Sequence, residues 1–131
     1  MKLLIDTHVW LWMLNKPTRI GLKTRRVLDN SRNEIFLSPM SIWEVVLIAR
    51  DGRLGKSTDP YQWFERAFAE FPLHEAPLTR EIALEMGRFE LRHGDPADRW
   101  LIATARVMAC KLVTEDEKII HSKCVETISS D

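Results

Sequence analysis

The sequence predicts an α/β fold with helices layered around a mostly parallel sheet. Short apolar runs that suit buried strands alternate with longer segments whose apolar residues recur at helical spacing, and this alternation is typical of such folds. The 131 residues are about one domain in length, and 45% of them are hydrophobic, which provides for one core. We therefore expect a single domain over residues 1–131.

The first half of the chain predicts two strands, each followed by helix. Apolar runs that stop at a polar residue indicate strands at Lys2–Ile5 and Glu34–Leu37. Asp6 or Thr7 can cap the helix that follows the first strand, and Ser38 before Pro39 is a typical start for the helix that follows the second. The helices expected in this half cover Thr7–Leu14, Gly21–Ser31 and Pro39–Gly52.

The second half continues the alternation. Asp59-Pro60 and Asp95-Pro96 each place a capping acid before a helix-opening proline, and Pro72 ends the first of these helices. Ile82, Met86 and Phe89 recur at helical spacing and predict another helix. The helices expected are Pro60–Phe71, one from Thr79 that closes at His93-Gly94, and one from Pro96 through Ala105; the strands are Leu73–Ala76, Lys111–Thr114 and an edge strand at Val125–Ile128.

Composition excludes several classes of protein. The 19 basic and 19 acidic residues cancel, so the chain has no global basic field and must hold any polyanion locally. The longest apolar run, Val9–Leu14, is far below the ~20 residues of a membrane span. We expect a cytoplasmic protein with no membrane partner, in which Cys110 and Cys124 are reduced core residues.

Four carboxylates fall at comparable places in this scheme. Asp6 ends the first strand and Glu44 lies in the helix after the second. Asp98 lies in the first turn of the last long helix, and Asp116 follows the strand after it. Ligands bind open parallel sheets beyond the carboxyl ends of the strands, where the strand order reverses. We expect the four acids to meet at this edge, provided that the last long helix begins there.

Gathered carboxylates repel one another unless a cation lies among them. Mg²⁺ and Mn²⁺ prefer oxygen ligands, and no histidine pair or thiol cluster in the sequence favours zinc. The pattern predicts a cofactor of one or two Mg²⁺ (or Mn²⁺) ions. The expected metal-binding and catalytic residues are Asp6, Glu44, Asp98 and Asp116, of which Asp116 is the weakest candidate.

Each acid also has a purely structural interpretation. Asp6 and Asp95 can cap helices, Asp98 would favour the helix dipole, and Ser41 with Glu44 fits a capping box if that helix starts late. Asp116 could be a turn acid. Four coincidences at one sheet edge are less frequent than one, which favours the metal site.

Five ordered segments resemble a PIN domain and, more narrowly, the VapC-type toxins of prokaryotic toxin–antitoxin pairs. They are Leu4–Trp12, Leu37–Ser38, Ser41–Val45, Asp95–Ala105 and Leu112–Asp116, so the likeness covers nearly the whole chain. The resemblance implies a three-layer α/β/α sandwich with a mostly parallel central sheet. It also implies a Mg²⁺- or Mn²⁺-dependent endoribonuclease that forms a homodimer and is inhibited by a VapB-like antitoxin.

The family's residues carry over one by one. Asp6, Glu44 and Asp98 match the three principal metal-binding acids, and Asp116 matches the more variable fourth. Residues expected to support the acids or to contact RNA are Thr7, Asp95, Arg99 and Thr114, with Lys23, Arg25 and Arg26 as further candidate phosphate contacts. Members of the subgroup often carry a basic residue four positions after the helix glutamate. Ile48 stands there in this chain, and Arg50 is the nearest substitute.

The expected reaction is hydrolysis of an RNA phosphodiester bond by a metal-activated water, which leaves a 3′-hydroxyl product. Two alternatives stay open. One is a catalytically idle binding module that acts only with a partner, and the other is a DNA-directed nuclease of similar fold. Five scattered glycines supply no glycine-rich phosphate loop, which argues against a nucleotide-binding enzyme.

Overall fold

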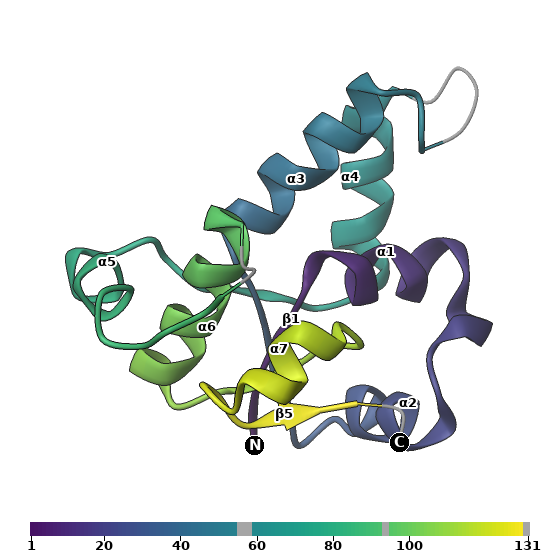
Figure 1. Ribbon diagram of the computed structural model, residues 1–131. Helices are drawn as coiled ribbons and strands as arrows, with labels where there is room; N and C mark the ends of the chain where they lie inside the picture. The colour runs from purple at the N-terminus through teal and green to yellow at the C-terminus, as the bar shows by residue number, and fades with distance from the viewer. Residues whose placement is uncertain (55–58, 93–94, 130–131) are drawn as a thin grey trace.

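The computed structural model describes residues 1–54, 59–92 and 95–129. Within them a five-stranded sheet has the order β3-β2-β1-β4-β5, and every neighbouring pair is parallel. The strands are β1 (Lys2–Ile5), β2 (Glu34–Leu37), β3 (His74–Glu75), β4 (Lys111–Val113) and β5 (Thr127–Ile128). Figure 1 shows the sheet crossed by helices from distant parts of the chain. The predicted α/β class is therefore confirmed.

The first strand lies at the centre of the sheet. Leu4 pairs with Phe36 on one side and with Leu112 on the other. The chain leaves β1 toward β2 and later returns to place β4 on the opposite side, so the strand order reverses between β1 and β4. In open parallel sheets this reversal is where a ligand site forms, at the carboxyl ends of the strands. Asp6 follows β1 at this point.

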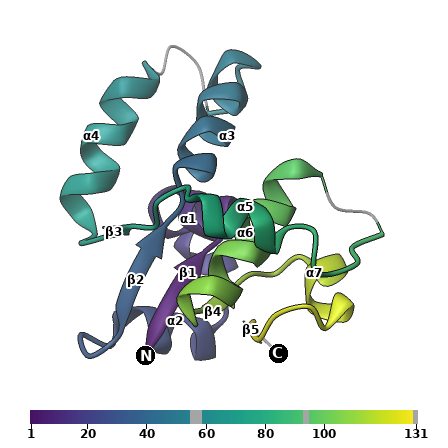
Figure 2. The same cartoon turned by 90° about the vertical axis from the view of Figure 1, so that its left-hand side faces the viewer.

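Helices cover both faces of the sheet and produce the expected three layers. Leu3 and Ile5 point into one core and Leu4 points into the other, as alternation along a strand requires. The first core receives side chains from α1 (Thr7–Asn15), from Ile20 just after the 3₁₀ turn η1 (Pro17–Arg19), and from α2 (Leu22–Asp29), α3 (Pro39–Arg50) and α4 (Pro60–Glu70). The second receives side chains from α6 (Pro96–Met108) and α7 (Glu117–Ser122), and α5 (Arg80–Glu85) lies beside α6. Figure 2 shows α3 and α4 extending together beyond the sheet.

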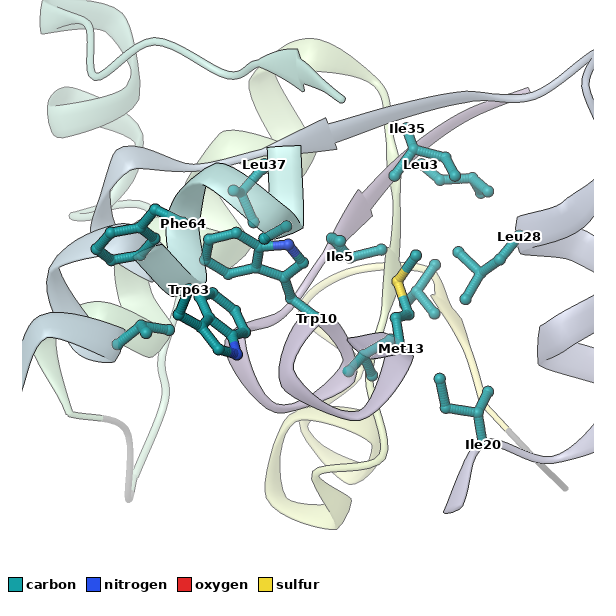
Figure 3. Packing of buried hydrophobic residues seen from close by; sticks show 14 residues of the cluster. Leu3, Ile5, Trp10, Met13, Ile20, Leu28, Ile35, Leu37, Trp63 and Phe64 are labelled. Atoms are coloured by element: carbon teal, nitrogen blue, oxygen red, sulfur yellow. The ribbon is translucent and has the colours of Figure 1, made fainter. Parts of the chain in front are cut away.

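Aromatic side chains fasten α4 to α1 (Figure 3). Trp10 is fully buried, and its ring centroid lies 4.9 Å from that of Trp63 and 6.1 Å from that of Phe64. Because large buried aromatic rings contribute most of the apolar area in such a contact, this cluster fixes α4 against the sheet. Phe68 also contacts Trp10 but leaves 47% of its surface exposed.

The three capping residues that are each followed by a proline are as predicted. Ser38, Asp59 and Asp95 each accept a hydrogen bond from a backbone N–H in the first turn of their helix. Proline fits the first helical position because its missing N–H has no partner there. The last long helix therefore begins at the expected residue, and Asp98 lies in its first turn.

The helix predicted from Thr79 to His93 is wrong in its length. The helix α5 ends at Glu85, and residues 86–89 form turns. The carbonyl oxygens of Met86, Phe89 and Leu91 accept hydrogen bonds from the guanidinium of Arg99. These side-chain bonds satisfy the backbone in a non-helical course. The predicted closing pair, His93-Gly94, lies outside the described residues.

Smaller differences concern short elements. The helix α7 has no counterpart in the prediction, and β3, β4 and β5 are each shorter than the apolar runs that predict them. Cys110 is a buried free thiol whose pKa is raised by burial, and Cys124 is a half-buried free thiol. Among the described residues, no helix has both the length and the apolar character needed to cross a bilayer.

Candidate active site

Asp6 is both a helix cap and a buried carboxylate. It follows β1 directly, and its Oδ1 accepts a hydrogen bond of 2.8 Å from the backbone N–H of Val9, which caps α1. Its Oδ2 accepts a hydrogen bond from the hydroxyl of Thr114, and only 6% of the residue is exposed. Burial raises the pKa of Asp6 to about 6, although both hydrogen bonds favour the charged form and oppose this rise.

Thr114 and Asp116 extend the site from the end of β4. Thr114 is fully buried, and its oxygen accepts a 3.1 Å hydrogen bond from the backbone N–H of Asp116 while its hydroxyl proton goes to Asp6. Asp116 caps α7 through a 2.9 Å bond from the backbone N–H of Lys118. The turn role considered for Asp116 is therefore real. The same residue also lies close enough to Asp6 for its negative charge to raise the pKa of Asp6.

Glu44 is brought to the site by the helix α3. Its Oε1 accepts a 2.5 Å hydrogen bond from the hydroxyl of Thr7, which is 2% exposed. The hydroxyl of Ser41 lies 2.9 Å from the same Thr7 oxygen. A carboxylate can only accept, so Thr7 gives its single proton to Glu44 and accepts one from Ser41. Because α3 starts at Pro39 with Ser38 as its cap, the capping-box interpretation of Ser41 and Glu44 is wrong.

Asp98 is the half-buried acid of the group. Its backbone N–H donates a 2.9 Å hydrogen bond to Asp95, which caps α6. Burial, followed in order by the negative charges of Asp95, Asp116, Glu44 and Asp6, raises the pKa of Asp98 to about 7. Asp98 therefore lies within electrostatic reach of the other three predicted metal-binding acids.

We refer to Asp6, Glu44, Asp98 and Asp116 as the acid cluster. They come from the ends of β1 and β4 and from α3 and α6, and they gather at the carboxyl edge of the sheet. Among the described residues, no three Asp, Glu, His or Cys side chains are placed so that they could hold a metal ion between them. Glu44 and Asp6 instead each accept a hydrogen bond from a threonine hydroxyl. Carboxylates that carry the same charge repel one another when no cation lies between them.

The donor chemistry of the cluster suits a hard divalent cation. All four groups offer carboxylate oxygens, which are the ligands that hard divalent cations prefer. Mg²⁺ is commonly held by one or two carboxylates and several waters, so direct contact with all four acids is not required.

The basic residues singled out from the sequence lie elsewhere. The guanidinium of Arg99 binds backbone carbonyls of the segment after α5, and that of Arg50 lies 5.9 Å from the ring centroid of Trp43. Among the described residues, none forms an ion pair with Glu44. Thr7, which is itself hydrogen-bonded to Ser41, provides a contact to Glu44 in place of a basic residue at position 48. Ser41 is the one supporting residue absent from the predicted set, although its position one turn before Glu44 was visible.

The helix α2 carries Lys23, Arg25 and Arg26. It leads into the start of β2, at the amino edge of the sheet, whereas the acid cluster lies at the carboxyl edge. These three side chains are exposed but remote from the acids. The structure does not bring them to the site.

The fold is a parallel α/β sandwich, and a cluster made only of carboxylates lies where its strand order reverses. These two features define a class of α/β domains with an acidic site. Such domains differ from proteins that use a phosphate-binding loop or a nucleophile triad. A family model described as PIN domain matches residues 3–123, and the chain belongs to this family. The resemblance inferred from the sequence is confirmed.

Individual relatives agree with the family. The chain is 26% identical over 117 residues to Ribonuclease VapC22 of Mycobacterium tuberculosis (strain ATCC 25618 / H37Rv). The matched region covers 88% of this chain and 88% of that protein. The structure of VapBC-1 from nontypeable Haemophilus influenzae superposes with a TM-score of 0.73, at 17% identity over 99% of this chain and 98% of that one. VapBC-5 of Mycobacterium tuberculosis, a member of the VapBC family of toxin-antitoxin systems, gives 0.65 at 18% identity and 98% coverage of both chains. These structural likenesses show the fold.

Proposed function

We propose that the protein is a divalent-metal-dependent endoribonuclease that acts as the toxin of a toxin–antitoxin pair. The observation that carries the proposal is the acid cluster, in which burial and then the charges of Asp95, Asp116, Glu44 and Asp6 raise the pKa of Asp98. Membership of the PIN family and the likeness to a curated ribonuclease support the choice of RNA as substrate. The whole of residues 1–131 would form one PIN domain.

Asp6, Glu44, Asp98 and Asp116 would hold the metal, directly or through waters. When bound, Mg²⁺ or Mn²⁺ supplies a Lewis acid that polarises the scissile phosphate and favours deprotonation of a water. The chain's own residues prepare the site for it. Thr114 fixes one oxygen of Asp6 and leaves Oδ1 on the helix cap, so the buried carboxylate has one orientation.

Thr7, supported by Ser41, fixes the side chain of Glu44 in the same way. The hydrogen bond from Thr7 fixes one oxygen of Glu44 next to the residue that follows Asp6 in the chain. Because water is the nucleophile, the ribose 2′-hydroxyl need not react and the products carry a 3′-hydroxyl. A 2′,3′-cyclic phosphate product would contradict this reaction.

The partners proposed are RNA, a VapB-like antitoxin and a second copy of this chain. The solved relatives are VapBC assemblies, which supports the antitoxin. An exposed apolar surface on the projecting helix α3, with Trp43 49% and Leu47 39% exposed, is consistent with a protein partner on that helix. RNA as substrate places the protein in the cytoplasm.

Cleavage of RNA by the purified protein tests the function. We expect cleavage in Mg²⁺ or Mn²⁺, none in a chelator, and none by Asp6→Asn, which removes a charge while keeping nearly the same shape. Circular dichroism of Asp6→Asn serves as the folding control. Full activity of that variant would refute the metal assignment, parallel DNA substrates separate an RNA from a DNA nuclease, and inactivity of the wild type on both would favour a binding module.

A further inference from the structure

A second charged feature lies next to the acid cluster. A cavity of about 450 Å³ opens between α7 and the chain segment before α6, and it is lined by Glu90, Leu91, Arg92, Lys118, His121 and Ser122. Arg92, Lys118 and His121 are exposed, and among the described residues none of them forms an ion pair. With His121 neutral, Arg92, Lys118 and Glu90 give the lining a net charge of +1.

The two walls of this cavity are fixed to each other. Leu91 and Ile119 pack in the same buried cluster, so the segment before α6 and the helix α7 share one core. The thiol of Cys124, just after α7, lies 3.1 Å from the carbonyl oxygen of Glu90. The cavity is therefore built from packed elements, and its cationic side chains stand on a defined frame.

Both walls lead straight to the acid cluster. Lys118 follows Asp116 by two residues, and its backbone N–H donates to the Asp116 carboxylate at 2.9 Å. Arg92 precedes Asp95, the cap of α6, by three residues. Residues 90–92 and α7 line the same cavity. The cavity is thus joined to the acid cluster through Lys118, whose backbone contacts one of the four acids.

A polyanion needs such a place on this protein. The chain has a formal net charge of zero, and the acid cluster itself repels phosphates. The basic residues of α2 lie at the opposite edge of the sheet and cannot offset this repulsion at the site. Arg92 and Lys118 stand at the carboxyl edge, where the repulsion acts.

We propose that the cavity lined by Arg92, Lys118 and His121 is a phosphate-binding site for the RNA strand that enters the acid cluster. The inference rests on the proposed ribonuclease function. Contacts of this kind hold the backbone without reading the base sequence. The site would therefore set the affinity and the path of the strand, and leave the chemical step to the acids.

Binding of a fluorescein-labelled single-stranded RNA to the full chain in EDTA, followed by anisotropy between 50 and 200 mM salt, tests the site. In Arg92→Gln/Lys118→Gln, we expect affinity to fall about two- to fivefold for each charge removed. The slope of log affinity against log salt should become shallower by about 0.7 for each lost phosphate contact. Lys16→Gln/Arg32→Gln is the matched control, because it removes the same charge from exposed side chains outside the cavity.

The outcomes separate the two proposals. The cavity site is refuted, and the ribonuclease stands, if wild type cleaves RNA and the cavity variant binds RNA no more weakly than the control variant. If wild type neither binds nor cleaves RNA, the proposed function fails and the cavity site falls with it. Thermal denaturation of each variant verifies that lost binding does not come from lost folding.

Discussion

The hydroxyl of Thr7 donates a 2.5 Å hydrogen bond to Oε1 of Glu44 and so joins the first turn of α1 to the middle of α3. Thr7 is almost fully buried, and its oxygen receives a further hydrogen bond from Ser41. A glutamate side chain has three rotatable bonds, and burying it in one conformation requires such a partner. The contact makes Thr7 a positioning residue for a proposed metal-binding acid.

Replacing Thr7 with valine should impair the site while keeping the fold. Valine has the same shape without the hydroxyl, so Glu44 loses its fixed orientation. We expect Mn²⁺ affinity and RNA cleavage each to fall by about 10- to 100-fold, as when partners of metal ligands are removed. Thr7→Ser keeps the hydroxyl and should recover most of both. Mn²⁺ binding by electron paramagnetic resonance provides the readout independent of catalysis, and equal behaviour of the valine and serine variants would contradict the role.

Thr24 offers a matched comparison and a prediction of its own. It is fully buried in α2, and its hydroxyl is one of the buried side-chain groups without a hydrogen-bond partner among the described residues. An unsatisfied buried hydroxyl costs about 1–3 kcal/mol. Thr24→Val should therefore raise the free energy of unfolding by about 1 kcal/mol, and should leave RNA cleavage unchanged. A lower denaturation midpoint in urea would show that the hydroxyl is satisfied in solution.

The metal-free protein should lose stability as the pH rises from 4 to 7. The pKa values of Asp6 and Asp98 are raised to about 6 and about 7, above the value near 4 of an unfolded chain. In this window the native state binds more protons than the unfolded state, so the free energy of unfolding decreases with pH and becomes level above the higher pKa. Melting curves in EDTA at pH 5 and pH 8 measure the effect.

Two further melting curves identify the cause. Asp98→Asn removes one of the raised carboxyls and should make the protein less sensitive to pH, with a higher melting temperature than wild type at pH 8. Mg²⁺ or Mn²⁺ should raise the melting temperature of wild type at pH 8, because an ion that binds only the native state stabilises it. A wild-type melting temperature that rises from pH 5 to pH 8 in EDTA would contradict the raised pKa values of Asp6 and Asp98.

The parts of the fold that sequence reasoning predicted are those set locally. Asp6 ends an apolar run, and prolines follow the caps Ser38 and Asp95, so strand ends and helix starts could be read from neighbouring residues. The same local signals positioned the acids. What they could not provide was the contact between Thr7 and Glu44, 37 residues apart, or between Asp6 and Thr114, 108 residues apart. Those distances depend on how helices pack on the sheet.

The mispredicted helix after Thr79 has the same origin. The spacing of Ile82, Met86 and Phe89 suits a helix, and nothing nearby in the chain contradicts it. The competing hydrogen bonds come from Arg99, on another helix, and only the folded structure brings its guanidinium to these carbonyls. Side-chain capture of backbone groups by a distant residue leaves no local pattern.

Arg99 is therefore expected to act on stability and not on RNA. Its planar guanidinium reaches three carbonyl oxygens at 3.2–3.5 Å, a geometry that the compact ammonium of lysine does not reproduce. Arg99→Lys should lower the free energy of unfolding by about 1–2 kcal/mol, because these half-buried carbonyls lose their partners. Urea denaturation measures this loss. RNA affinity measured by anisotropy should match wild type at a temperature where both proteins are folded, because the charge is kept and no phosphate contact is removed. A variant with unchanged stability and weakened RNA binding would instead place Arg99 among the substrate contacts predicted from the sequence.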